Sequence, residues 1–348
     1  LSIRRQRQMC IRDREYLADF LPRKIIDVHA HVWLKSFVDE ANVETRTAQW
    51  PRRVAEDSPI EELLATYRLM LPQQSVTPLL FGWPERNVIL QQTNDYVSQV
   101  ARQHNLPCLI VSRPEWSSEG LERLVNDGGF LGLKPYLSFA PPHIPSDEIT
   151  IFDFLPHCHL EVADAHGWIV MLHIPRPARL KDPVNLEQML EIERRYSHVR
   201  LIIPHIGRAY CTQDVGNAFD VLRHAERMLF DLSANTNAQV FERFLRAFGP
   251  RRVMFGSDLP ILRMRMRRIC ENGVYINLVP PGLYGDISND PHMREVSPKE
   301  GERLSFFLYE ELLALRRAAE ATGLSAADIE DVFYNNAARL ITDVSRRL

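Results

Sequence analysis

Two histidines, His29 and His31, lie one residue apart within residues 25–32, where β-branched residues predict a buried strand. Side chains at positions i and i+2 of a strand point to the same side, so the two imidazoles should lie next to each other. Neutral imidazole binds Zn²⁺, Mn²⁺, Fe²⁺ or Ni²⁺, so the pair predicts a metal site without naming the metal. Such pairs also arise by chance, and other strands must therefore supply further ligands.

Further polar groups follow other apolar runs. They are His173 after 168–172, His205 after 201–204, Asp258 after 253–257, and Lys134 near the end of 132–135. A polar group at the end of a buried strand is costly unless it is paired or ligated. A core histidine bonded to a backbone carbonyl is the alternative for any one of them, but the whole set favours one shared site.

Eight short apolar runs have the length of strands buried on both faces. They span residues 25–32, 76–82, 107–112, 129–136, 168–174, 199–206, 228–232 and 252–258. Helical patterns between them cover residues 87–104, 117–126, 151–166, 185–196, 214–227 and 237–248. This alternation predicts an α/β protein with a (β/α)₈ TIM barrel. An open doubly wound sheet is the rival, but no Gly-x-Gly-x-x-Gly follows the first strand.

Two connections are too long for simple loops: residues 33–75 after strand 1, with a helix near 59–71, and residues 259–301 after strand 8. Both follow carboxyl ends of strands, where barrel enzymes hold their active sites, so we expect lids or specificity elements rather than surface decoration. Residues 302–322 and 325–344 predict closing helices, the second with a capping box at Ser325 and Asp328.

The composition of the 348 residues, 45% hydrophobic and 25% charged, is that of a soluble globular protein. A net charge of −3 gives no drive toward nucleic acid or an anionic membrane, and no apolar run has the roughly 18 residues of a membrane span. The five cysteines are scattered, which argues against a disulfide framework and favours a cytoplasmic location.

The first 14 residues carry five arginines and one aspartate with no apolar stretch behind them. We expect residues 1–14 to be a non-native or disordered basic tail and residues 15–348 to form a single barrel domain. A secretory signal would need an apolar core of about 7–15 residues.

The arrangement of these groups resembles the amidohydrolase superfamily, and within it the amidohydrolase-related branch of hydrolases and decarboxylases. The matching motifs are Asp-Val-His-Ala-His at 27–31, Leu-His at 172–173, Pro-His-Ile-Gly at 204–207, Phe-Gly-Ser-Asp at 255–258 and Tyr-Asn-Asn-Ala-Ala-Arg-Leu at 334–340. The resemblance implies a metal-dependent barrel, and by analogy alone a homodimer.

The resemblance also implies roles for the site residues. His29, His31 and His173 would hold one divalent metal ion, with zinc favoured and manganese the alternative. Asp258 would bind the same ion weakly or accept the proton of its water, and would then act as general base and acid. His205 would contact the attacked carbonyl or the hydroxide rather than the metal.

Lys134 has three interpretations: a carboxylated bridge to a second metal, a cation that binds a substrate carboxylate, or a lysine paired with an acidic neighbour. We favour the substrate-binding cation. Arg176 and Arg208 each lie three residues beyond a histidine and suit bidentate capture of a carboxylate or phosphate, with surface salt bridges as the alternative. Tyr136 and Trp33 are candidates to line the pocket. The basic run 263–268 is interpreted as a solvated face.

Three functions remain open, all on a small-molecule substrate. The favoured one is a metal-dependent hydrolase in which metal-bound hydroxide attacks an amide, lactone or ester carbonyl of a carboxylated substrate. The second is a non-oxidative decarboxylase of an aromatic or unsaturated acid, which uses the same ligands. An aromatic pocket would favour decarboxylation, and a substrate-clamping arginine would favour hydrolysis. A non-enzymatic barrel would be expected to have lost a ligand, and none is missing.

Overall fold

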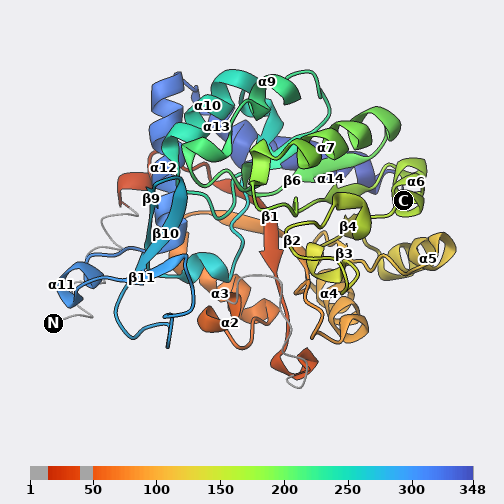
Figure 1. Cartoon of the computed structure of the whole chain (residues 1–348), viewed down its shortest axis with the longest axis horizontal. Helices are drawn as coiled ribbons and strands as arrows, with labels where there is room; N and C mark the ends of the chain where they lie inside the picture. The colour runs from red at the N-terminus through yellow and green to blue at the C-terminus, as the bar shows by residue number, and fades with distance from the viewer. Residues whose placement is uncertain (1–14, 40–49, 348) are drawn as a thin grey trace.

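The computed structural model describes residues 15–39 and 50–347. Eight parallel strands form its centre (Figure 1). They are β1 (Lys24–His31), β2 (Ser75–Phe81), β3 (Ile110–Val111), β4 (Gly132–Lys134), β5 (Ile169–Met171), β6 (Arg200–Ile203), β7 (Leu229–Asp231) and β8 (Val253–Met254). Each matches a predicted run. The expected residues 1–14 tail lies outside the described residues.

The eight strands close into a (β/α)₈ TIM barrel, which confirms the predicted fold. One ladder joins β1 to β2 and another runs in chain order from β3 to β8. Two parallel bridges join the ladders: Leu80 with Cys108 between β2 and β3, and Ala30 with Leu259 between β1 and the end of β8. Buried side chains from six strands pack into one cluster with Ala337 and Leu340 of the last helix, so the barrel has a filled core.

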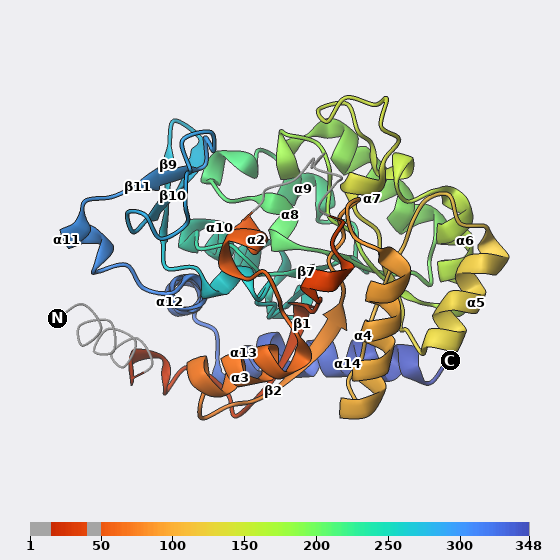
Figure 2. The same cartoon turned by 90° about the horizontal axis from the view of Figure 1, so that it is seen from below.

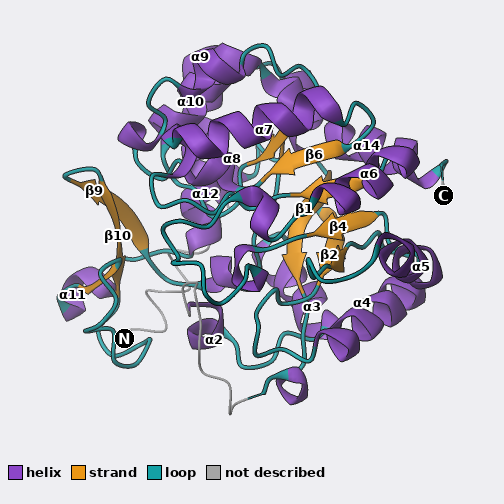
Figure 3. Cartoon of the chain, turned by 45° about the vertical axis from the view of Figure 1, so that its right-hand side comes forward, coloured by secondary structure: helices purple, strands orange, loops and turns teal. Residues whose placement is uncertain are grey.

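Helices surround the strands (Figure 3). They are α2 (Trp50–Val54), α3 (Ile60–Met70), α4 (Leu90–His104), α5 (Ser118–Gly128), α6 (His157–His166), α7 (Pro183–Arg195), α8 (His205–Arg208), α9 (Ala218–Leu222), α10 (Ala238–Phe248), α11 (Pro298–Gly301), α12 (Phe307–Thr322), α13 (Ala326–Glu330) and α14 (Asn336–Ser345). Three are clearly shorter than predicted. The closing helix expected over 302–322 begins at Phe307. The helix expected over 151–166 begins only at His157 because Pro156 disfavours helical backbone before it, and the helix expected over 214–227 is reduced to α9.

The predicted capping box precedes α13. Ser325 Oγ accepts from the Asp328 amide at 3.2 Å, and Asp328 Oδ2 accepts from the Ser325 amide at 2.9 Å. The helix α13 therefore begins directly after Ser325, as the sequence pattern predicts.

The connection after β8 holds a small sheet that the sequence reasoning missed. It consists of β9 (Arg267–Glu271), β10 (Val274–Val279) and β11 (Met293–Glu295), and it lies beside the barrel (Figure 2). β9 and β10 are antiparallel around Asn272 and Gly273, which both have positive φ. Asn-Gly between two strands is a strong hairpin signal, but the arginines before it were interpreted as a solvated face.

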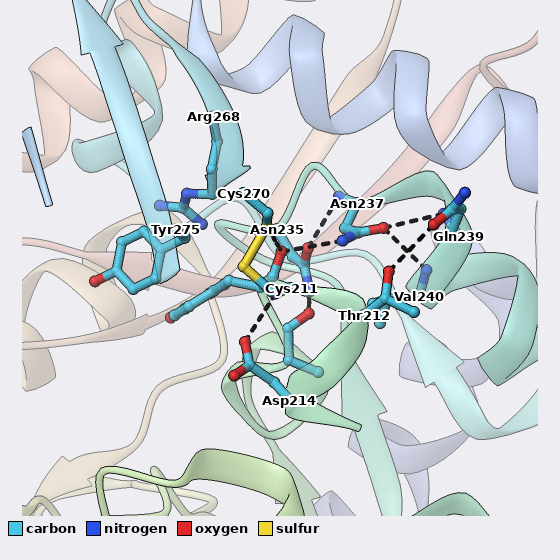
Figure 4. Close-up of a disulfide and its surroundings, with 12 residues drawn as sticks. Cys211, Thr212, Asp214, Asn235, Asn237, Gln239, Val240, Arg268, Cys270 and Tyr275 are labelled. Carbon is cyan, nitrogen blue, oxygen red and sulfur yellow. Dashed lines mark hydrogen bonds between the residues drawn. A yellow bond between two sulfur atoms is a disulfide. The ribbon is translucent and has the colours of Figure 1, made fainter. Parts of the chain in front are cut away.

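The cysteine prediction is wrong, because Cys211 and Cys270 form a disulfide (Figure 4). The two residues are 59 positions apart, and the fold brings the segment after β6 against β9. This pairing removes the argument from the cysteines for a reducing, cytoplasmic location. Cys108 and Cys158 are free. Within 15–39 and 50–347, no helix is both long and apolar enough to cross a bilayer.

Candidate active site

The predicted strand-end groups meet in one cavity of about 480 Å³, a size typical of small-molecule sites. Those that line it are His29 and His31 from β1, Lys134 from β4, His173 after β5, His205 and Arg208 after β6, and Asp258 after β8. Tyr136 and Trp33 line it too. The carboxyl ends of the strands therefore form the candidate site, as in other barrels.

His29, His31 and Asp258 form a compact group at the cavity floor. The Nε2 atoms of His29 and His31 lie 3.4 and 3.2 Å from Asp258 Oδ1, and the three ligand atoms lie within 4.8 Å of one another. The pairing of β1 with β2 shifts in register between Asp27 and Ala30. Such irregularities re-aim side chains next to sites, and this one lies where His29 projects.

Hydrogen bonds behind the two histidines fix which nitrogen faces Asp258. His31 Nδ1 lies 3.1 Å from the Gly82 carbonyl oxygen, which can only accept, so Nδ1 carries the proton. His29 Nδ1 lies 2.9 Å from Asp231 Oδ2 and donates to it in the same way. In the neutral rings, both Nε2 lone pairs thus face the Asp258 carboxylate. Acceptors facing acceptors at this distance require a cation or a proton between them.

Asp231, at the end of β7, is a functional residue that sequence reasoning missed. It is fully buried, it orients His29, and its Oδ1 accepts from the backbone amides of His205 at 2.9 Å and Ser233 at 3.0 Å. Partners of this kind set the orientation and basicity of a ligating histidine. An aspartate inside the apolar run 228–232 was the available signal.

His205 begins a left-handed turn. His205, Ile206, Gly207 and Arg208 all have φ between 47° and 61°, a conformation that costs about 1–2 kcal/mol for each residue other than glycine. The Nδ1 of His205 lies 2.8 Å from the Ser233 carbonyl oxygen and donates to it, so the lone pair is on Nε2. The turn places the His205 ring 5.0 Å from that of His29, between centroids.

His173 lines the same cavity but stands apart from the compact group. Its ring centroid is 5.3 Å from that of His205 and 4.9 Å from that of Tyr136. Its Nδ1 is buried and has no hydrogen-bond partner among the described residues. A buried imidazole nitrogen without a partner is costly, and a bound cation would satisfy it.

Protonation states suit a cation. Burial lowers the pKa of His29 and His173 well below the ordinary value, and it lowers the pKa of His205 as well. Burial raises the pKa of Asp258, but the histidines beside it outweigh this and lower the pKa to about 2. At neutral pH the site thus offers the neutral imidazoles of His29, His173 and His205 and the carboxylate of Asp258, and these donors fit a divalent transition-metal ion.

Lys134 is a buried cation in the cavity, with a side chain 1% exposed. Its Nζ lies 4.9 Å from the centre of the Phe81 ring and has neither a hydrogen bond nor an ion pair within the described parts of the chain. Burial lowers its pKa to about 8, against the opposing effect of Asp231 and Asp258. The ammonium is therefore mostly charged at pH 7 and open to an anionic ligand.

The two predicted arginines differ in position. Arg208 lines the cavity, and its Nη1 donates to the carbonyl oxygens of Ile174 at 3.2 Å and Pro175 at 3.0 Å. Arg176 does not line the cavity, and its Nε instead lies 3.2 Å from Asp182 Oδ1. The prediction for Arg176 is corrected accordingly: the irregular chain after β5 turns its side chain away, because distance along a loop does not fix direction.

Several cavity residues had no role in the sequence reasoning. Arg268 and Tyr275 come from the unpredicted hairpin, and Tyr210 follows the left-handed turn. Glu85 lines the cavity too, and burial raises its pKa to about 8. These residues lie on connections after strands, where sequence periodicity gives no signal.

A family model described as amidohydrolase matches residues 26–341, almost the whole chain. No curated protein matches the chain in sequence. Many solved structures share its fold. Among them are a dihydroxybenzoic acid decarboxylase from Polaromonas sp. JS666 with bound manganese and the inhibitor 2-nitroresorcinol, a probable 2-pyrone-4,6-dicarboxylic acid hydrolase from Acinetobacter baumannii with citric acid bound, and an amidohydrolase from Burkholderia multivorans with bound HEPES.

Each of these three structures is 15% identical to this chain, with TM-scores of 0.56, 0.55 and 0.57 in that order. They cover 92%, 91% and 91% of this chain, and the chain covers 97%, 99% and 99% of theirs. At this identity the likeness shows the shared barrel fold.

Proposed function

Because this chain belongs to the amidohydrolase family, we propose that it is a metal-dependent hydrolase of a small carboxylated amide, lactone or ester. One observation carries the proposal. The Nε2 atoms of His29 and His31 face the Asp258 carboxylate at 3.4 and 3.2 Å with their lone pairs, and in the same cavity the buried Nδ1 of His173 has no hydrogen-bond partner among the described residues. A divalent cation would satisfy these donor atoms together in a buried site.

The proposed metal ligands are His29, His31, His173 and Asp258. Zinc is favoured and manganese is the alternative, since a fold relative holds manganese. When bound, the ion supplies a Lewis acid that polarises the scissile carbonyl and lowers the pKa of a water. One ion suffices, and a second would require a carboxylated Lys134.

The surrounding side chains handle the proton. Asp258 is ionised at neutral pH and lies at the cavity floor, so it accepts a proton from the attacking water and returns it to the leaving group. The Nε2 lone pair of His205 faces the cavity and accepts a hydrogen bond from the same water, because its Nδ1 is committed to Ser233. His205 therefore orients the water instead of donating to the carbonyl while it is neutral.

The cationic side chains of Lys134 and Arg208 would bind the substrate carboxylate. The buried ammonium of Lys134 gives a carboxylate a partner in a poorly solvated place, where a charge-assisted hydrogen bond is strong. Arg208 adds positive charge at the cavity wall, and the ring of Tyr136 lies beside His173. A carboxylated substrate would thus be held while its carbonyl reaches Asp258 and the histidines.

A non-oxidative decarboxylase is the second candidate. Aromatic side chains line much of the cavity, among them Trp33, Trp83, Tyr136, Tyr210 and Tyr275. Such walls suit a flat aromatic acid. Asp258 or His205 would then take up a proton from solvent and deliver it to the ring carbon as the bond to the departing carbon dioxide breaks. The clamping cations favour hydrolysis over this reaction.

Turnover of a substrate panel separates the two reactions. We expect the metal-loaded protein to hydrolyse a member of a set of carboxylated amides and lactones, and Asp258→Asn to lower kcat by about 100-fold or more. Carbon dioxide release from hydroxybenzoates is measured in parallel. Carbon dioxide release without any hydrolysis would replace the hydrolase by the decarboxylase.

A further inference from the structure

We infer that the substrate carries a second anionic group, and that Arg268 with Arg208 binds it at a separate wall of the cavity. The inference rests on the proposed function for the first group, the carboxylate held near Lys134. We call the second place the arginine wall and define it by Arg208, Tyr210, Arg268 and Tyr275. All four residues line the cavity.

Arg268 is a deeply placed cation. It lies on β9, is 9% exposed, and its Nε donates to Asn277 Oδ1 on β10 at 2.8 Å. The guanidinium carbon is 4.5 Å from the centre of the Tyr210 ring and 4.8 Å from that of Tyr275. This stacking fixes the plane of the fork. Its Nη1 donates to the Ala234 carbonyl oxygen. A fixed guanidinium that lines a cavity suits a charge-assisted hydrogen bond to a carboxylate.

Arg208 supplies the second cation of the wall. Its Nη1 is bonded to backbone carbonyl oxygens, whereas its Nη2 and Nε have no hydrogen bond among the described residues. Burial raises the pKa of Tyr275, and Arg268 and Arg208 both lower it, so both charges act at this ring. Arg179 also lowers the pKa of Tyr275, but its charge is paired with Asp214 through two hydrogen bonds of 2.9 Å, and it does not line the cavity.

The disulfide holds the wall together. Cys270 lies two residues beyond Arg268 on β9, and Cys211 directly follows Tyr210 (Figure 4). The bond therefore ties the hairpin that carries Arg268 to the segment that carries Arg208 and Tyr210. Fixing a binding wall before the ligand arrives lowers the ordering cost of binding.

The arginine wall and the first anion site are built from different elements of the fold. Lys134 comes from β4, whereas the wall comes from the β9–β10 hairpin and the segment after β6. A ligand with one acidic group satisfies only one of these places. A ligand with two acidic groups at the right spacing satisfies both, so the cavity should select dianions over monoanions.

Binding of simple probes tests this without turnover. Unbranched α,ω-dicarboxylates from three to eight carbons are titrated calorimetrically into the metal-loaded protein, next to monocarboxylates of equal length. We expect the dicarboxylate to bind at least about tenfold more tightly than its partner at one chain length or more, as for an added charged hydrogen bond. If no length shows this advantage, or no dicarboxylate binds, the inference is overturned.

Variants then identify the residues that make dicarboxylates bind more tightly than monocarboxylates. Arg268→Met should abolish it and leave monocarboxylate affinity unchanged, which also shows that the site is still folded. Arg267→Met is the matched control, because Arg267 is the exposed neighbour on the same strand, and it should keep the full advantage. If Arg268→Met fails to fold, Arg268→Lys carries the test. An advantage that survives in these variants would make Arg268 a structural stacking residue.

The disulfide gives an independent variant. Cys270→Ser should reduce the dicarboxylate advantage by about threefold or more and leave monocarboxylate affinity unchanged. Cys158→Ser is the control, since Cys158 is a free thiol on α6. A full advantage in Cys270→Ser would show that the disulfide does not position the wall. The binding results do not depend on whether any member of the substrate panel is hydrolysed. The proposed function and the arginine wall are therefore tested independently.

Discussion

At the residue scale, the atom behind each histidine decides what its other nitrogen can do. The Gly82 carbonyl, Asp231 and the Ser233 carbonyl each accept a hydrogen bond from the Nδ1–H of one ring. All three Nε2 lone pairs are left for the cavity. The ligand role proposed for His29 therefore depends on Asp231 as much as on the histidine itself.

Asp231→Asn should weaken metal binding. The amide keeps the shape of the carboxylate but removes the charge that supports the His29 ring, and such changes lower metal affinity by about 10–100-fold. Competition with a chromogenic chelator measures the affinity. Asp220→Asn, at an exposed position on α9, should have no effect. Equal metal affinities of Asp231→Asn and the wild type would show that Asp231 does not support the metal site.

Lys134 should make substrate binding depend on pH. Its pKa is about 8 in the folded protein, so the ammonium that binds the carboxylate is present below pH 8 and is lost above it. We expect KM to rise as the pH increases through 8. In Lys134→Arg, KM should stay flat, because arginine remains charged to above about pH 12.

Glu85 is the group that could mimic this effect, since its pKa is also about 8 and its ionisation would repel an anion. The rise in KM should therefore persist in Glu85→Gln. A KM that falls with increasing pH would instead indicate that Lys134 acts as a neutral amine or in carboxylated form.

Site residues could be predicted from the sequence where they follow directly on a strand, because the end of the strand fixes their position. His29, His31, His173, His205, Lys134 and Asp258 all reach the cavity, because the carboxyl ends of parallel strands meet at one rim. Arg176 could not be placed because the chain after β5 is irregular. Asp231 could not be assigned a role because it acts through its hydrogen bond to His29. A single acidic residue in an apolar run does not indicate which histidine it will contact.

At the element scale, the left-handed turn His205–Arg208 is the least ordinary piece of backbone in the site. Gly207 has φ 61°, and an added Cβ would lie 2.5 Å from Leu180 Cδ1. The turn is held by the bond from the His205 amide to Asp231 and by Arg208 Nη1 on three carbonyl oxygens. Its shape brings His205 and Arg208 into the same cavity.

Gly207→Ala should therefore destabilise the protein more than its backbone angle alone requires. Gly323 has a similar conformation, φ 70° and ψ 34°, but open space around it, so Gly323→Ala reports backbone strain of about 1 kcal/mol. Gly207→Ala should cost about 1–3 kcal/mol more through overpacking against Leu180. Urea unfolding measures both. Equal losses would mean that Leu180 moves aside freely.

The elements of the barrel could be predicted because buried parallel strands read as continuous apolar runs. The β9–β10 hairpin could not, although Asn272 and Gly273 mark its turn. Its strand residues include Arg267 and Arg268, and the burial of Arg268 depends on rings from distant segments. Strand β9 is therefore stabilised by tertiary packing, which the local sequence pattern does not show.

At the scale of the whole molecule, the site exists because the barrel closes. The bridge between Ala30 and Leu259 joins the first and last strands, and it lies between His29 and His31 on one side and next to Asp258 on the other. Closure thus brings ligands 227 residues apart into contact. A metal at this seam should stabilise the fold because it binds only the native state.

Chelation should accordingly lower the melting temperature of the protein. Metal at 100 times its dissociation constant adds about 2.7 kcal/mol to the free energy of unfolding, and calorimetry with and without chelator measures the shift. His31→Ala should melt at the same temperature with or without added metal. A melting temperature that does not depend on metal in the wild type would mean that the seam holds no ion.

Metal content is the most direct test of the central claim, a metal centre built from His29, His31, His173 and Asp258. The full chain is loaded with zinc or manganese, dialysed, and measured by inductively coupled plasma mass spectrometry beside His29→Ala and His173→Ala. We expect bound metal in the wild type at a fixed ratio to protein, and its loss in both variants. A wild type that retains no metal, or variants that retain as much as the wild type, would contradict it.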